Sequence, residues 1–111
     1  MAEVRWRLDA AWVGEAYCGW QRQPNGLSVQ ETIEQVCTQL FNEPIKVVAA
    51  GRTDAGVHVA HQVLGMTTPK PMTKHALKRG LNALLPNDIS VLSVQEMPPQ
   101  FQPRSWGYKK W

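Results

Sequence analysis

The first twelve residues alternate between apolar and polar positions. Apolar side chains recur at every second residue from Val4 to Trp12, and Arg5, Arg7 and Asp9 lie between them. A period of two indicates a β-strand with one buried face. The opposite face then carries two arginines, which suit either a solvated surface or contact with the phosphates of a nucleic acid.

Two segments show the spacing of three and four residues that is typical of amphipathic helices. In the first, Ser28 can cap the N-terminus, an apolar stripe covers 29–41, and 42–44 (Asn-Glu-Pro) ends the helix. In the second, Thr73 is the expected cap and Pro86 marks the end. The leucines of the second helix that we expect to face the core are Leu77, Leu81, Leu84 and Leu85.

Three further apolar runs are short and rich in β-branched residues, at 45–49, 57–66 and 89–94. We interpret them as strands. In the second run the apolar residues change parity, so we expect either two partly covered faces or a bulge near His61. The order of elements predicts an α+β fold of the ferredoxin-like or RRM-like plan, βαββαβ, with an antiparallel sheet and two helices on one face.

Composition adds limits rather than a function. With 43% hydrophobic and 19% charged residues in 111, the chain reads as one globular domain. A net charge of +3 permits a polyanionic partner without requiring one. No apolar run is long enough to span a membrane and the start does not resemble a secretory signal, so we expect a cytoplasmic protein. Cys18 and Cys37 are isolated and are interpreted as packing residues.

Polar chemistry is concentrated in 51–58, Gly-Arg-Thr-Asp-Ala-Gly-Val-His, between the second and third predicted strands. In extended chain Arg52 and Asp54 share a face, and a charge-assisted hydrogen bond between them would keep Asp54 ionised. Gly51 and Gly56 leave room for a substrate to approach. The spacing alone favours a structural ion pair in an ordinary loop, because such pairs also perturb pKa values and short motifs often match by chance.

The loop over residues 14–26 interleaves aromatic, amide and basic side chains. They are Tyr17, Trp20, Gln21, Arg22 and Gln23. Such groups suit stacking on unpaired bases combined with contact to phosphates. The alternative is that Trp20 caps the edge of the core while the amides face solvent.

His58 and His61 are three residues apart, which raises the question of a metal site. On a strand these two positions face opposite ways, and no cysteine or acidic residue lies at ligand spacing. We therefore expect no zinc site, and we expect His58 to brace the loop by hydrogen bonding.

Residues 51–58, followed by Gln62-Val63, resemble the signature of the TruA-type tRNA pseudouridine synthases, Gly-Arg-Thr-Asp-Ala-Gly-Val-His-Ala-x-Gly-Gln-Val. The chain differs at Val59 and His61, where that signature has Ala and Gly. The resemblance extends along nearly the whole chain. Further matching residues are Gly14, Tyr17, Gly19-Trp20-Gln21, Gln23, Val29-Gln30, Leu81-Asn82, Leu85-Pro86, Asp88-Ile89, Phe101 and Arg104.

The resemblance implies an isomerase that converts uridine to pseudouridine in the anticodon stem-loop of tRNA, as a homodimer without cofactor or metal. By correspondence Asp54 is the catalytic aspartate, acting as a nucleophile or as a base, and Arg52 orients and ionises it. Together with the patterns above, the resemblance gives these candidates for RNA contact: Arg5, Arg7, Tyr17, Trp20, Gln21, Arg22, Gln23, Thr53, His58, Gln62 and Arg104.

The family also has an active-site tyrosine several residues beyond its Phe-x-x-Arg segment, whereas this sequence ends at Trp111. We expect 1–100 to form an N-terminal domain that carries the Asp54 motif, and 101–111 to begin the connection to a second half. Whether the 111 residues are active alone stays open. Two alternatives stay open as well: a non-catalytic RNA-binding module, and an unrelated small interaction domain with a coincidental loop.

Overall fold

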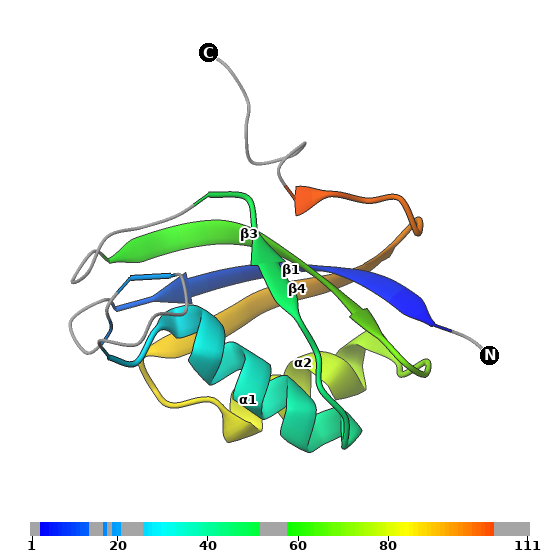
Figure 1. Ribbon diagram of the computed structural model, residues 1–111, viewed down its shortest axis with the longest axis horizontal. Coiled ribbons are helices and arrows are strands. Elements are labelled where there is room, and N and C mark those ends of the chain that lie inside the picture. The colour runs from blue at the N-terminus through cyan, green and yellow to red at the C-terminus, as the bar shows by residue number, and fades with distance from the viewer. Residues whose placement is uncertain (1–2, 14–16, 18, 21–25, 52–57, 104–111) are drawn as a thin grey trace, which may run out of the picture.

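The computed structural model describes residues 3–13, 17, 19–20, 26–51 and 58–103. Its strands form one antiparallel sheet in the order β2-β3-β1-β4. Both helices lie against the same face of that sheet (Figure 1). The predicted α+β, ferredoxin-like βαββαβ fold is therefore confirmed. The elements, in chain order, are β1 (Val4–Trp12), α1 (Val29–Phe41), β2 (Val47–Ala49), β3 (Val59–Thr68), α2 (Lys74–Leu84) and β4 (Ile89–Met97).

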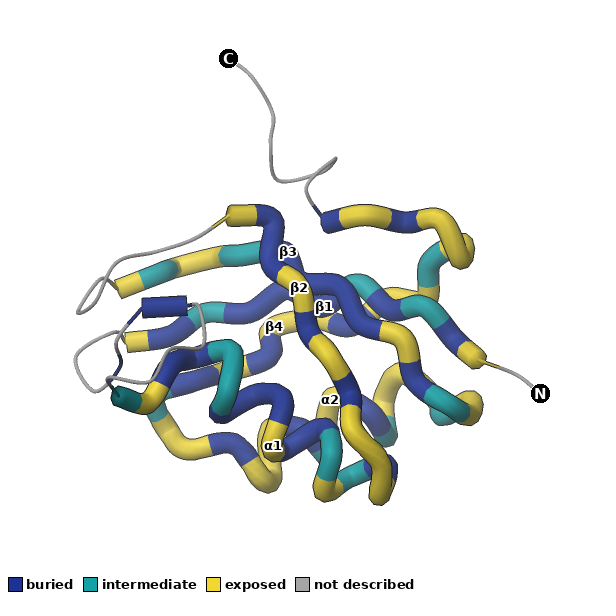
Figure 2. The backbone as a smooth tube through the Cα atoms, viewed as in Figure 1, coloured by how far each residue is buried: buried dark blue, intermediate teal, exposed yellow. Residues whose placement is uncertain are grey.

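The core lies between the sheet and the helices. Buried residues are dark blue in Figure 2, and they occur on the strands and on both helices. Leu8 of β1 and Leu64 of β3 contribute from the sheet, and Ile33, Leu77 and Leu81 from the helices, and each is fully buried. Fully burying one such side chain stabilises the fold by about 1.5–3 kcal/mol. The period-two pattern of β1 and the helical stripes thus meet in one core, as predicted.

Both helices begin at the caps that the sequence predicts. The Glu31 N–H donates to Ser28 Oγ at 3.1 Å, and the Ala76 N–H donates to Thr73 Oγ1 at 3.1 Å. Helix α1 ends at Asn42, which adopts a left-handed conformation with φ 59°. Each capping bond satisfies an N–H that the first helical turn leaves without an intrahelical partner.

Some boundaries differ from the prediction because pairing, and not local composition, decides where a strand ends. Strand β4 was expected to end at Val94, but it continues to Met97, since Met97 pairs with Arg5 of β1. Strand β2 begins only at Val47, and β3 covers 59–68. Leu84, expected in the core, is 40% exposed.

The pairing of β1 with β3 is irregular near His61. Ala10 pairs with Gln62 and Trp12 pairs with Val59, so one residue of β1 lies opposite two residues of β3. The predicted bulge near His61 is confirmed. A bulge of this kind bends the strand and redirects the side chains that follow it.

The segment after β4 returns across the sheet face that the helices leave uncovered (Figure 1). Phe101 is 5% exposed and packs with Ala50, Val63 and Met97 in a second, smaller apolar cluster. A Cβ added to Gly65 would stand 2.7 Å from Cγ of Pro103, so the proline ring lies directly on that glycine. Both faces of β3 are therefore partly covered.

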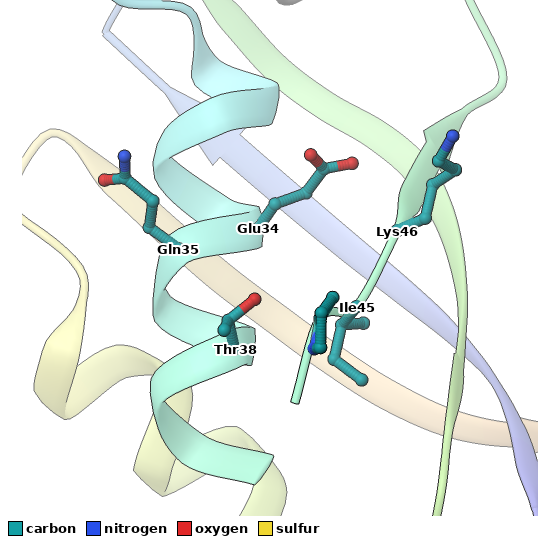
Figure 3. A pocket seen from close by; sticks show the side chains of 6 residues that line it. Glu34, Gln35, Thr38, Ile45 and Lys46 are labelled. Carbon is teal, nitrogen blue, oxygen red and sulfur yellow. The ribbon is translucent and has the colours of Figure 1, made fainter. Parts of the chain in front are cut away.

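Helix α1 fastens the edge strand β2 through side chains. Glu34 Oε2 accepts from the Val47 N–H at 2.9 Å, and Gln30 Nε2 donates to the Val47 carbonyl at 3.1 Å. These bonds occupy backbone groups at a sheet edge that could otherwise pair with another chain. Figure 3 shows Glu34 reaching from α1 toward the segment before β2. A hollow of about 550 Å³ lies there, lined by Glu34, Gln35, Thr38, Pro44, Ile45 and Lys46.

Cys37 is fully buried in α1, with its Sγ 3.6 Å from Sδ of Met66. Burial, together with the charge of Glu34, raises the pKa of the Cys37 thiol to about 12. The thiol is therefore un-ionised and unreactive at neutral pH, and the packing role predicted for Cys37 is confirmed. Cys18 lies outside the described residues.

Candidate functional site

The motif at 51–58 joins the end of β2 to the start of β3, and the structure describes its two ends, Gly51 and His58. Arg52, Thr53 and Asp54 lie outside the described residues, as do Gln21, Arg22, Gln23 and Arg104. The roles expected for these seven residues stay predictions. The described ends place the attachment points of the motif at one end of the sheet.

Gln62 ties β3 to the beginning of the motif. Its Nε2 donates to the carbonyl of Gly51 at 3.2 Å, and the neighbouring Ala50 N–H donates to the Val63 carbonyl at 2.9 Å. A Cβ added to Gly51 would meet Gln62 Nε2 only at 4.0 Å. Among the described residues, this amide nitrogen is thus at the distance of an ordinary contact from that position. The RNA contact predicted for Gln62 stays a prediction.

Gly19 and Trp20 begin the path into α1. Their carbonyls accept from the N–H groups of Val29 at 3.1 Å and Gln30 at 2.9 Å, the first amides of that helix. Gly19 has φ 83°, a conformation that side chains rarely adopt, so glycine is required at this turn. The matched Gly-Trp pair thus has a structural role, which is to close the N-terminal end of α1.

Trp20 stacks on Trp12, with ring centroids 5.7 Å apart and planes inclined by 28°. Trp20 is 4% exposed and Trp12 is 3% exposed. This agrees with the alternative in which Trp20 caps the core. In the described conformation little of the ring faces solvent for stacking on a base.

Tyr17 is also buried, and its hydroxyl donates to Asp88 Oδ1 at 2.6 Å. The Val13 N–H donates to the Asp88 carbonyl at 2.9 Å, so Asp88 holds the chain on two sides of this loop. Burial and the neighbouring Asp88 carboxylate raise the pKa of Tyr17. Tyr17 is thus a neutral hydrogen-bond donor that anchors the loop to the start of β4.

Arg5 lies on the sheet face away from the helices, under the returning segment. Its Nε donates to the Phe101 carbonyl at 3.1 Å and its Nη1 donates to Thr67 Oγ1 at 3.2 Å. Its guanidinium carbon stands 5.8 Å from the centre of the Phe101 ring, within the range of a cation–π contact. Arg5 therefore holds the C-terminal segment on the sheet, which neither alternative for this residue anticipated.

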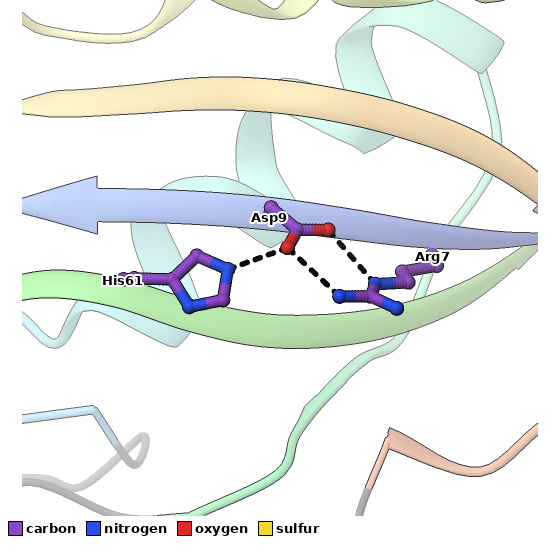
Figure 4. A network of polar contacts seen from close by, with 3 residues as sticks. All are labelled: Arg7, Asp9 and His61. Atoms are coloured by element: carbon purple, nitrogen blue, oxygen red, sulfur yellow. Dashed lines mark hydrogen bonds and ion pairs between the residues drawn. The ribbon is translucent and has the colours of Figure 1, made fainter. Parts of the chain in front are cut away.

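Arg7, Asp9 and His61 form a connected polar cluster on the same face (Figure 4). Arg7 Nε and Nη2 donate to Asp9 Oδ1 at 2.9 Å and Oδ2 at 3.1 Å. His61 Nε2 lies 2.5 Å from Asp9 Oδ2. Burial alone would raise the pKa of Asp9, but the hydrogen bonds and charges of Arg7 and His61 prevail and lower it. Asp9 is therefore an ionised carboxylate held between the guanidinium of Arg7 and the ring nitrogen Nε2 of His61.

The sequence reasoning missed Asp9 although a signal was present. Arg7 and Asp9 stand two apart on one strand, which is the spacing used above to pair Arg52 with Asp54. The contribution of His61 comes from the neighbouring strand, so its approach to Asp9 depends on the register and on the bulge.

A second hollow, of about 330 Å³, lies at the motif end of the sheet. It is lined by Ala11, Trp12, Val13, His58, Val59, Ala60, Asn87, Asp88 and Ser90. His58 is exposed at this hollow. The hollow therefore brings the end of the motif next to the turn between α2 and β4.

Within the described residues, no group of three or more histidine, cysteine or acidic side chains is arranged to hold a metal ion. In the same part of the chain, no helix combines the length and apolarity that a bilayer crossing requires.

Comparison with known proteins gives the family of this chain. A family model described as tRNA pseudouridine synthase matches residues 10–104. The chain is 50% identical over 98 residues to tRNA pseudouridine synthase A of Geobacter sulfurreducens, covering 88% of this chain and 40% of that protein. It is 40% identical over 105 residues to the protein of that name from Pelobacter propionicus, covering 95% and 43%. With the enzyme of that name from Francisella tularensis the identity is 43% over 97 residues, covering 87% and 38%. The chain thus spans about two fifths of the length of these curated relatives, and it belongs to the tRNA pseudouridine synthase family.

Proposed function

We propose that this chain is part of a tRNA pseudouridine synthase that isomerises uridine to pseudouridine in the anticodon stem-loop, with Asp54 as the catalytic residue. The observation that carries the proposal is the family match over residues 10–104, which contains all of 51–58. Because the chain spans about two fifths of the relatives, it supplies one part of the substrate cleft. The names of the relatives state the activity of those proteins, and for this chain the activity is the proposal made here.

The reaction breaks the bond between uracil N1 and the ribose and forms a bond from C5 to the same ribose carbon. N1 gains a proton and C5 loses one, so the conversion needs no oxidant or reductant. Asp54 is the motif's carboxylate, and it acts either by attacking the sugar or base or by taking a proton from the sugar. Arg52, two residues before it, keeps this carboxylate ionised and oriented.

A uridine stacked in an RNA helix is out of reach of a side chain, so the target base must be flipped out, at a cost of roughly a few kcal/mol. The surroundings of the motif suit this step. His58 lines a hollow of about 330 Å³ at the end of the sheet where the motif joins β3. This hollow supports a nucleotide entering where 51–58 ends.

The remaining candidates divide by their described surroundings. For Tyr17 and Trp20, burial favours a role in holding the loop, and their contact with RNA stays a prediction. His58 and Gln62 lie at or next to the end of β3 that joins the motif and suit direct contact, whereas the guanidinium of Arg7 is engaged by Asp9, and its contact with RNA stays a prediction. The RNA contacts proposed at positions outside the described residues are Gln21, Arg22, Gln23, Thr53 and Arg104.

The proposal extends to the setting of the enzyme. We expect a homodimer that works in the cytoplasm on tRNA without a cofactor or metal, as the family resemblance implies. An RNA-binding module without catalysis is the second candidate, because the fold is shared with RNA-recognition domains. It would bind tRNA in a salt-dependent manner and convert no uridine.

The test uses the full-length protein and tRNA that carries tritium at uracil C5, because conversion releases that tritium to water. Asp54→Asn should lower the rate of tritium release by about a hundredfold to ten-thousandfold, which is the usual loss for a missing general acid or base. The matched control is Glu43→Gln, at an exposed carboxylate beyond α1, which should keep the wild-type rate. Wild-type protein that binds tRNA but releases no tritium would favour the second candidate. An Asp54→Asn variant as active as the wild type would remove Asp54 from its role.

A further inference from the structure

The sheet face opposite the helices is only partly covered by the chain itself. Phe101 packs on Val63 and Pro103 on Gly65, and this covers the middle of β3. His61 is two residues beyond Val63, toward the motif, and its side chain is 54% exposed. The uncovered part of the face therefore begins at His61.

The orientation of the His61 ring is fixed by Asp9. The ring nitrogen Nε2 is held at Asp9 Oδ2, while Arg7 occupies both oxygens of the same carboxylate from the other side (Figure 4). Because Nε2 is engaged by a carboxylate, it carries a proton. The other ring nitrogen, Nδ1, is the polar atom that the ring presents to a ligand.

The charges on this face favour an anion. The cations among the described residues whose side chains share the face of Asp9, by pairing or by parity within β1, β3 and β4, are Arg5 and Arg7. The other strand residues opposite them, Ser93, Gln95 and Met97, are uncharged. Asp9 is therefore the one carboxylate within the described strands of this face, and Arg7 balances it.

The distance from the motif also suits a nucleic acid. His61 lies in β3, three residues after His58, which is the described end of the motif. A strand of RNA with one nucleotide at the motif would carry its neighbouring backbone close to His61.

We propose that His61, positioned by Asp9, binds a backbone phosphate of the RNA next to the target nucleotide, a contact that a chain with glycine at this position does not make. Asp9 is the positioning residue and His61 is the contacting one. The inference rests on the proposed function in one respect, which is that the ligand is tRNA.

The experiment measures the affinity of full-length protein for tRNA across a range of salt concentrations. His61→Gln keeps a polar side chain without the imidazole ring, and His61→Gly removes the side chain altogether. The matched control is His75→Gln, at an exposed histidine of α2 on the helix side of the sheet. We expect both His61 variants to raise Kd about fivefold, as for an exposed charge contact. The slope of log K against log salt should fall by about 0.7–0.9, the value for one phosphate contact. His75→Gln should change neither quantity.

A double-mutant cycle tests the role of Asp9. If Asp9 acts by holding His61, Asp9→Asn should weaken binding in the wild-type background and have a smaller effect when His61 is already glutamine. Equal effects in the two backgrounds would overturn the positioning role.

Unchanged affinity and slope in the His61 variants would overturn the phosphate contact. A raised Kd with an unchanged slope would also overturn it, because the contact would then be to a base or sugar. Tritium release separates this result from the proposed function. Wild-type activity with an unchanged slope for His61→Gln refutes the contact alone, whereas the predicted slope change in a protein that releases no tritium refutes the activity alone.

Discussion

Pro103 lies on Gly65 so closely that a Cβ at position 65 would stand 2.7 Å from Cγ of the proline. A proline ring has little freedom to move aside, so Gly65→Ala should push the returning segment off the sheet. We expect a loss of about 1–3 kcal/mol in the free energy of unfolding, the usual cost of overpacking. Urea denaturation of the wild type and the variant measures it.

Gly51→Ala is the matched control for that substitution. Among the described residues, its added Cβ would meet Gln62 Nε2 alone, at 4.0 Å, which is ordinary contact. We expect its stability to stay within about 0.5 kcal/mol of the wild type, as for surface substitutions in general. Equal destabilisation by the two alanines would show that the contact with Pro103 does not govern position 65.

Asp9 should make stability depend on pH in the acid range. Because its pKa in the folded protein lies below the ordinary value of 3.8, its contribution to stability is fully present above 3.8. That contribution is lost as the pH falls through the lower folded-state pKa, where both states become protonated. Asp9→Asn should therefore be less stable than the wild type at neutral pH, by about 1–3 kcal/mol, and the difference should shrink in acid.

Unfolding of the two proteins by urea at a series of pH values measures this difference. Glu43→Gln serves as the control, since Glu43 is exposed, and its curve should run close to that of the wild type. Parallel curves for Asp9→Asn and the wild type down to the lowest pH would contradict the clamped carboxylate.

The comparison of sequence with structure separates local features from long-range ones. Local patterns were enough for β1 and for both helix caps, because alternation and a capping oxygen act within a few residues. They were not enough for the end of β4, which Arg5 decides from the other end of the chain. The cluster of Arg7, Asp9 and His61 combines both kinds of feature. The contact of Arg7 with Asp9 could be predicted from their spacing, but the approach of His61 depends on strand pairing and on the bulge.

The loop residues show the same division. Residue type left both an RNA surface and the edge of the core open for this loop, and the family resemblance favoured RNA contact for Tyr17 and Trp20. Their partners are Asp88, which is 71 residues away, and Trp12, which lies on the buried face of β1. Burial of an aromatic ring depends on such tertiary partners, so residue type alone does not tell a binding aromatic from a packing one.

Tyr17→Phe should destabilise the protein through the loss of its bond to Asp88. A hydrogen bond to a charged group contributes about 1.5–3 kcal/mol, so we expect a loss in this range in denaturant unfolding. Pairing the change with Asp88→Asn in a double-mutant cycle isolates the bond. If the two losses simply add, the Tyr17 hydroxyl is not held by Asp88 in solution.

Trp20 distinguishes a packing role from a binding role most directly. Trp20→Ala removes a 4% exposed ring from its stack on Trp12, and we expect a loss of about 3–5 kcal/mol, as for other buried aromatic residues. Trp20→Phe keeps an aromatic ring and should recover part of that stability. Thermal unfolding measures both, and tRNA affinity is measured at a temperature where Trp20→Phe is folded. A packing role requires large stability losses with tRNA affinity preserved in Trp20→Phe. A variant that unfolds like the wild type but binds tRNA weakly would show instead that the ring leaves the core to meet the RNA.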